Sequence, residues 1–250
     1  LYEWEGYISP AELLRLYKPA TGAVSAANHK INGDDYPHFM GAEFDPGWRA
    51  ARLEEMLAEK DRHSLRDMAE MQLDTASKYA ARLAPFFGRL EPVDSFEKVA
   101  AGYLRRWDYR MEADSPAAMI FHYCWLHLAG LTFGEALGLA RDGYWGITNA
   151  PLFLIHGFRL RAATRLLELV ECQEESVWYG VDAAGELRTR EQALQAALAR
   201  AVRQIRSEFG DNARRWDWGR AHQVRYVHPL GGTPVLRTFF NRGPFPVGGD

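Results

Sequence analysis

Two polar side chains, Asn28 and Arg49, are of types that serve in catalysis and also of types that are common in ordinary structure. Asn28 ends the apolar stretch AVSAAN, and Arg49 stands near the start of the segment WRAARLEEMLAEK. A carboxamide can donate N–H to a developing oxyanion without adding net charge, and a guanidinium can hold several oxygens in a fixed fork. Taken alone, Asn at a strand end is most often a turn residue, and Arg at a helix start is most often solvated. Residue type alone therefore favours the ordinary interpretations.

Other site signatures are absent or weak in this sequence. It has no G-x-S-x-G, no Gly-rich phosphate loop, no C-x-x-C and no H-x-x-x-H pattern. Among His122, Cys124 and His127, only the last two are helical neighbours, and two ligands are too few for a closed zinc site. His222 and His228 would share one face of a strand but lie about 20 Å apart. Core or hydrogen-bonding roles are therefore favoured for all five, and no metal site is predicted.

Residues 35–48 contain carboxylates and aromatic rings with two alternative roles each. The carboxylates are loop residues or cation ligands, although their spacing matches no calcium loop; they are Asp35, Glu43 and Asp45. The aromatic residues line a pocket or pack in a core, and packing is favoured; they are Phe39, Phe44 and Trp48.

Bulk composition indicates an ordinary globular protein. The chain has 250 residues, 47% hydrophobic and 25% charged, which suits one large domain or two smaller ones. The formal net charge of −3 gives no reason to expect binding to nucleic acid or to an anionic membrane. Two cysteines make no disulfide framework; Cys124 lies in an apolar run and indicates a buried thiol, while a bond to Cys172 stays an alternative.

Residues 1–46 predict a short helix, a strand and a long loop. Ser9-Pro10-Ala11-Glu12 has the form of a capping box, and the helix it starts would stop at Lys18-Pro19. Thr21-Gly22 predicts a turn into AVSAAN, which predicts a short buried strand.

Residues 47–210 predict helices, and residues 211–250 predict a return to strands. WRAARLEEMLAEK predicts one helix, and Ser64 with Asp67 opens a second, SLRDMAEMQLDTASKYAARL. The apolar run Ala117–Leu131 is too short to span a bilayer and predicts a buried helix. Further helices are predicted at 95–106, 115–130, 158–170 and 189–209, the last burying Leu194, Ala197, Leu198, Ala201, Val202 and Ile205. Strands are predicted in HQVRYVHP and around Val235–Phe240, with Trp216 and Trp218 covering the core.

Both ends of the sequence indicate a piece of a longer polypeptide. The chain opens on LYEWEGYISP without an initiator Met or a signal peptide, and it closes abruptly on PVGGD.

An ordered set of segments resembles the penicillin amidase (penicillin acylase) family of N-terminal-nucleophile hydrolases. WEGYISPAELLRLYKPATGAVSAAN is similar to the family's Trp-x-Gly segment, its Asn-Pro-x-x-Gly turn and its strand ending in Asn, with Lys18 in place of the usual Asn. The resemblance continues over nearly the whole chain through Tyr36-Pro37, WRAARLEEML, MQLDTASKYAARL, LRRWDYRMEADSPAAMIF, WDWGRAHQVRYVHPLGG and GPFPVGGD.

The resemblance implies an α+β fold that forms part of a four-layer αββα sandwich with a large helical insertion. The chain would be an internal section of the β subunit, truncated at both ends. Residues 1–85 would belong to the sandwich core with the oxyanion-hole strand, 86–210 to the helical insertion, and 211–250 to the returning sheet.

The same resemblance implies roles for Asn28 and Arg49. The family's nucleophile is a Ser at the β subunit's N-terminus, exposed by autocatalytic cleavage, whose own amine acts as the base and whose hydroxyl forms an acyl-enzyme. Asn28 falls at the family's oxyanion-hole Asn. Arg49, 21 residues further on, falls at the family's Arg near the nucleophile's amine.

The sequence departs from the family pattern at two points. No residue here has family support as the nucleophile, so the Ser would lie outside this chain. Some members bind calcium with an Asp just after Tyr-Pro, but here His38-Phe39-Met40 follow, so this section does not support a calcium site. No cofactor is expected, and calcium stays an expectation for the longer protein only.

The resemblance therefore implies a periplasmic or secreted hydrolase of linear amides, with penicillin, cephalosporin or N-acyl-homoserine lactone substrates. Its partners would be the acyl-amide substrate and the other α- and β-subunit segments, without nucleic acid or membrane. A catalytically inactive family member and an independent helical interaction module are the alternatives.

Overall fold

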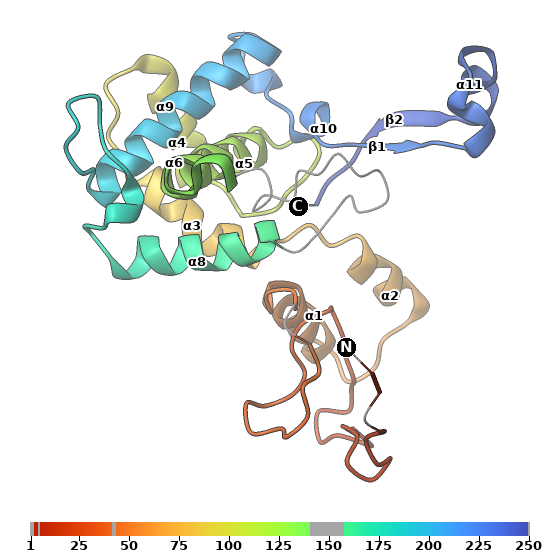
Figure 1. Ribbon diagram of the computed structural model, residues 1–250. Coiled ribbons are helices and arrows are strands. Elements are labelled where there is room, and N and C mark those ends of the chain that lie inside the picture. Colours follow the sequence, from red (N-terminus) through yellow and green to blue (C-terminus); the bar gives the residue numbers. More distant parts are fainter. Residues whose placement is uncertain (1–2, 5, 42–43, 141–157, 250) are drawn as a thin grey trace. The chain divides into compact units, whose positions relative to one another are not determined.

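The computed structural model describes residues 3–4, 6–41, 44–140 and 158–249 (Figure 1). The chain divides into two compact units, Leu1–Gln72 and Leu73–Asp250, each of which is considered by itself. In the described part of the chain, helices dominate and a small antiparallel sheet is present, so the fold class is α+β, as predicted. The predicted domain limits at residues 85 and 210 stay a prediction.

In its described residues, the first unit contains the helices α1 (Trp48–Ala58) and α2 (Leu65–Gln72). The predicted capping pair opens α2, because the Asp67 amide donates to Ser64 Oγ at 3.2 Å and the Ser64 amide donates to Asp67 Oδ2 at 2.7 Å. Hydrogen bonds from Lys60 and Ser64 hold the pKa of the Asp67 carboxyl below its usual range. The start of this helix is confirmed.

The helix predicted after Ser9 is wrong. Ser9 instead forms a single turn, in which its carbonyl accepts from the Glu12 amide at 2.9 Å. The leucines that would form the buried face of such a helix are exposed; they are Leu13, Leu14 and Leu16. Since most helix stability in proteins comes from packing an apolar face, the capping residues alone do not sustain a helix here.

The strand predicted for AVSAAN is also wrong, although the segment is extended. Residues 23–26 have no regular ladder, and the nearby pairing is one isolated parallel bridge between His29 and Asp45. Val24 is exposed, so the segment lacks both the burial and the hydrogen-bonded neighbour that define a buried strand. The turn at Thr21-Gly22 is confirmed by a bond of 2.9 Å from the Gly22 amide to the Pro19 carbonyl.

The long helix predicted from Ser64 is broken in two. After α2, the chain resumes as α3 (Lys78–Gly88), capped by the side chain of Ser77. Backbone groups of residues 73–77 form hydrogen bonds with residues 109–111. The Ser77 amide donates to the Tyr109 carbonyl at 2.9 Å, and the Met111 amide donates to the Thr75 carbonyl at 2.8 Å. Because these groups bond to a distant segment, they cannot form a helical ladder.

Five helices form the core of the second unit: α3, α4 (Ser95–Arg105), α5 (Pro116–Ala129), α8 (Phe158–Cys172) and α9 (Arg190–Phe209). All lie where helices are predicted, and α5 packs against α4, α8 and α9 (Figure 1). The predicted face of α9 is buried in full, and α5 is buried on most sides. Among the described residues, no helix is both long enough and apolar enough to cross a bilayer.

Short helical elements connect these helices. They are η1 (Gly130–Gly134, a π-helix), α6 (Glu135–Leu137), η2 (Gly138–Ala140), η3 (Val177–Tyr179), η4 (Ala213–Arg215), α10 (Trp218–Ala221) and η5 (Pro229–Gly232). Trp216, just before α10, and Trp218, its first residue, are buried, as predicted.

The small sheet pairs β1 (Gln223–Tyr226) with β2 (Arg242–Pro246), and α11 lies at its far end (Figure 1). The strand predicted in HQVRYVHP is confirmed. The strand predicted around Val235–Phe240 is wrong, because this segment is helix α11 (Pro234–Phe240). Pro234 occupies its first turn, where the missing N–H and the fixed φ favour a helix start.

Candidate active site

Asn28 lies beside the loop that leads into α1. Its backbone has φ of +59°, a left-handed conformation that Asn tolerates better than most residues. The Asp45 amide donates to the Asn28 carbonyl at 2.9 Å, next to the His29–Asp45 bridge. These contacts hold Asn28, whose side chain is exposed, against the segment that precedes Arg49.

Arg49 is the second residue of α1, and its guanidinium reaches back to three oxygens. Its Nη2 atom donates to the Ala27 carbonyl at 3.3 Å, to Asn28 Oδ1 at 3.0 Å and to Asp45 Oδ2 at 2.5 Å. The structure therefore brings together the two residues that the resemblance singles out, although 21 positions separate them.

This contact fixes which atom of the Asn28 amide faces Arg49. A guanidinium can only donate hydrogen bonds, so the atom it meets must be the carbonyl oxygen Oδ1 and not the amide nitrogen. Asn28 Nδ2 consequently points away from Arg49, and it has no hydrogen-bond acceptor among the described residues. The arrangement presents a neutral N–H donor with a defined direction.

Asp45 completes the cluster as the carboxylate partner of Arg49. Arg49 is 61% exposed and Asp45 24% exposed, so their ion pair contributes only about 0–1 kcal/mol of stability. Its effect is geometric, because Asp45 Oδ2 and Asn28 Oδ1 bond to the same Nη2 atom of Arg49. Of the two roles considered for Asp45, the structure favours the loop carboxylate.

A pocket of about 330 Å³ lies in the loop that follows Asn28, lined by residues between Lys30 and Gly41. His38 and Phe39 line it, and Phe39 is 84% exposed, contrary to the packing role favoured from sequence. His38 Nε2 lies 3.8 Å from Glu12 Oε2. Phe44 and Trp48 are half-buried, and Glu43 lies outside the described residues.

The histidines considered as site residues have structural partners. His127 Nε2 pairs with Gln204 Oε1 at 2.8 Å, and partial burial lowers the pKa of this imidazole. His222 Nδ1 lies 3.1 Å from the Val247 carbonyl, and His228 Nδ1 accepts from the Leu230 amide at 3.1 Å. Both flank β1 and do not lie within it, so the predicted shared strand face is wrong.

The two cysteines are free thiols in different surroundings. Cys124 is fully buried in α5, and burial raises the pKa of its thiol; Cys172 is exposed at the end of α8. The disulfide alternative is therefore not adopted in the structure.

The Ala27 carbonyl and Asp45 are the partners of Arg49 that sequence reasoning missed. The signal for Asp45 was its spacing, four residues before an Arg. No comparable signal marks the Ala27 carbonyl, because every residue has a backbone carbonyl and the residue type does not indicate which one Arg49 will contact.

The chain is similar to proteins of one family over its whole length. The family model described as Penicillin amidase matches residues 1–250. The chain is 27% identical over 262 residues to penicillin acylase 2 proenzyme of Pseudomonas sp. (strain SE83), covering 100% of this chain and 30% of that protein. It is 26% identical over 269 residues to acyl-homoserine lactone acylase QuiP of Pseudomonas fluorescens (strain Pf0-1), again covering 100% and 30%. The chain thus spans about a third of the length of these curated relatives.

Proposed function

The chain belongs to the penicillin amidase family, and from this premise we propose that it is a section of a hydrolase that cleaves linear amides through an acyl-enzyme. The nucleophile in this proposal is an N-terminal Ser outside the present chain, exposed by autocatalytic cleavage. The chain would contribute to a four-layer αββα sandwich as an internal section of the β subunit.

The hydrogen bond between Arg49 and Asn28 is the observation that carries the proposal. Attack on an amide carbonyl places negative charge on its oxygen, and the transition state needs donors that are already oriented toward that charge. Arg49 turns Asn28 Oδ1 toward itself, which leaves the Asn28 N–H groups directed away and available to the oxyanion. We assign Asn28 as the oxyanion donor and Arg49 as the residue that positions it.

Arg49 has a second consequence for the same site. Its charge is permanent, so it disfavours protonation of an amine brought close to it. In the proposed mechanism that amine is the N-terminus of the nucleophilic Ser, which must be neutral to accept the hydroxyl proton.

The names of the relatives suggest two substrate classes, penicillins and acyl-homoserine lactones. Both contain a linear acyl-amide bond outside their ring, and we extend only this shared feature to the present protein. We propose a periplasmic or secreted location, the remaining subunit segments as partners, and no cofactor held by this section.

Intact-mass analysis of the full-length gene product tests the proposed processing. We expect two chains, with the larger one beginning at a Ser upstream of Leu1, because autocleavage must free the Ser amine before it can act as a base. A single uncleaved chain, or a new N-terminus without a hydroxyl or thiol side chain, would contradict the proposal and favour a catalytically inactive family member.

Replacing Arg49 with Lys tests the positioning role. We expect kcat for amide hydrolysis to fall about tenfold, because a single ammonium on a flexible stem does not hold the Ala27, Asn28 and Asp45 oxygens in one geometry. Arg66→Lys is the matched control in the same unit, since Arg66 pairs with Glu70 on the surface of α2 at 2.8 Å. Equal kcat values for the two variants would show that Arg49 does not position Asn28.

A further inference from the structure

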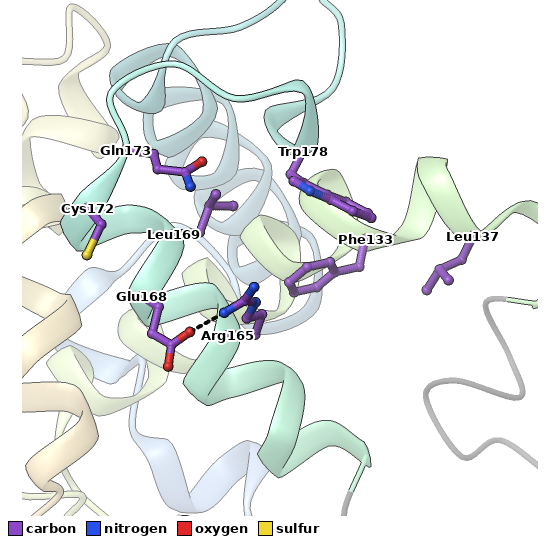
Figure 2. Close-up of a pocket in the computed structure, with 8 residues that line it drawn as sticks. All are labelled: Phe133, Leu137, Arg165, Glu168, Leu169, Cys172, Gln173 and Trp178. Atoms are coloured by element: carbon purple, nitrogen blue, oxygen red, sulfur yellow. Dashed lines mark hydrogen bonds and ion pairs between the residues drawn. The ribbon is translucent and has the colours of Figure 1, made fainter.

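A pocket of about 480 Å³ opens in the second unit between α8, η1 and η3, and nothing in the proposed mechanism uses it (Figure 2). Its volume falls in the range of small-molecule sites. Phe133 and Leu169 form nearly buried parts of its wall, with 7% and 8% of their surfaces exposed. Trp178 also lines the pocket, and 46% of its surface is exposed, so its indole is only partly covered by the described residues.

The aromatic wall is held in place before any ligand arrives. The ring centroids of Phe133 and Trp178 lie 6.0 Å apart, with an interplanar angle of 59°. Figure 2 shows the two side chains beside each other. Ser176 caps η3 by accepting from the Trp178 amide at 3.3 Å. The fully buried Tyr179 ties η3 to α8, because its hydroxyl lies 3.0 Å from the Leu169 carbonyl and 2.8 Å from the Gln173 carbonyl. Binding of a ligand would therefore cost little conformational entropy in these side chains.

Among the lining residues that the structure describes, the charges at the rim cancel. Arg165 Nη1 pairs with Glu168 Oε2 at 2.6 Å across one turn of α8 (Figure 2). An anionic ligand that approaches Arg165 meets the Glu168 carboxylate, and a cationic ligand meets the Arg165 guanidinium. Gln173 adds a carboxamide at the rim, whose side chain has no hydrogen-bond partner within the described part of the chain. Such a group both donates and accepts, and so it matches another neutral amide.

We propose that this pocket binds an uncharged amphiphile, with its flat apolar body against Phe133, Leu169 and Trp178 and an amide-type head at Gln173. Aromatic contact with the open face of Trp178 supplies most of the affinity, and the paired charges discriminate against ionised ligands. The pocket lies in the second compact unit, whereas Asn28 and Arg49 lie in the first. The proposal therefore does not depend on the hydrolase mechanism.

Calorimetric titration with two matched probes tests the site. The probes are 1-naphthaleneacetamide and 1-naphthaleneacetate, which share one aromatic body and differ in head-group charge. At pH 7 we expect the amide to bind about tenfold more tightly than the carboxylate. The absence of saturable binding of the amide up to its solubility limit would overturn the site. A carboxylate that binds as tightly as the amide would overturn the preference for uncharged ligands.

Two variants locate the binding in this pocket. Trp178→Ala is expected to weaken amide binding about tenfold, while Val177→Ala, at an exposed neighbour outside the pocket, should leave the affinity unchanged. Glu168→Gln frees Arg165 and is expected to raise carboxylate affinity about tenfold without changing amide affinity. Because Glu168 is exposed, this variant remains informative even where Trp178→Ala alters folding. Unchanged carboxylate affinity in Glu168→Gln would place the binding elsewhere and overturn the assignment.

Discussion

Replacing Asn28 with Ala or Gly in the full-length protein should lower kcat for the proposed amide hydrolysis by about 100- to 1,000-fold, the usual cost of removing one oxyanion donor. The side chain accepts one hydrogen bond from Arg49 and offers its own N–H groups to no acceptor among the described residues. Its loss therefore removes a donor that is free for the transition state. Steady-state hydrolysis of a chromogenic linear amide measures the effect.

The pair of variants separates catalysis from backbone strain. Asn28 has φ of +59°, which Gly adopts without cost and Ala adopts at about 1–2 kcal/mol. We therefore expect Ala to lower the melting temperature and Gly to preserve it, while both lower kcat equally. A Gly variant with wild-type kcat would show that Asn28 serves the backbone turn and not the reaction.

Asn28→Asp provides an isosteric control. The carboxylate keeps an oxygen for Arg49 but offers no N–H and adds negative charge beside the forming oxyanion. We expect a loss of kcat at least as large as that of the Gly variant. Activity retained in Asp would contradict the donor role, because a carboxylate at neutral pH cannot perform it.

The candidate site shows where sequence reasoning reaches its limit. Residue type alone favoured ordinary roles for Asn28 and Arg49, and only the resemblance made them site residues. Their contact, and the direction it imposes on the amide, depend on how the loop at Asp45 folds back along residues 27–29. The separation of 21 residues between Asn28 and Arg49 does not predict that contact. The catalytic roles themselves stay predictions until the variants are measured.

Elements of the fold that depend on their own residues could be predicted, whereas elements that depend on contacts with distant residues could not. Helices α5 and α9 were predictable because their own residues determine them. Ser115 and Thr189 cap them, α5 is a continuous apolar run, and α9 has apolar residues at helical spacing. The break after α2 was not predictable, because residues 73–77 leave the helical ladder to bond to residues 109–111. The segment at Val235–Phe240 is a short apolar run, which by periodicity fits a strand and a helix equally well. The true second strand, β2, contains Pro244 and Pro246, residues that normally argue against a strand.

The largest effect on stability is expected from Trp216→Ala, which should lower the free energy of unfolding by about 3–5 kcal/mol. Trp216 is fully buried, and its Nε1 donates at 2.7 Å to the carbonyl of Gly210, the C-cap residue that follows α9. The substitution leaves a cavity and also an unpaired carbonyl at a helix terminus. Urea unfolding followed by circular dichroism measures the loss.

Two further variants assign that loss to its causes. Trp216→Phe keeps most of the apolar volume but removes the donor, so it should cost about 1–3 kcal/mol, the penalty for the unpaired Gly210 carbonyl. Trp4→Ala removes the same side chain from a site that is 89% exposed and should change stability by less than about 0.5 kcal/mol. If Trp216→Ala cost no more than Trp4→Ala, burial of this indole would not stabilise the second unit. The agreement between its predicted and observed position would then say nothing about what holds the helices together.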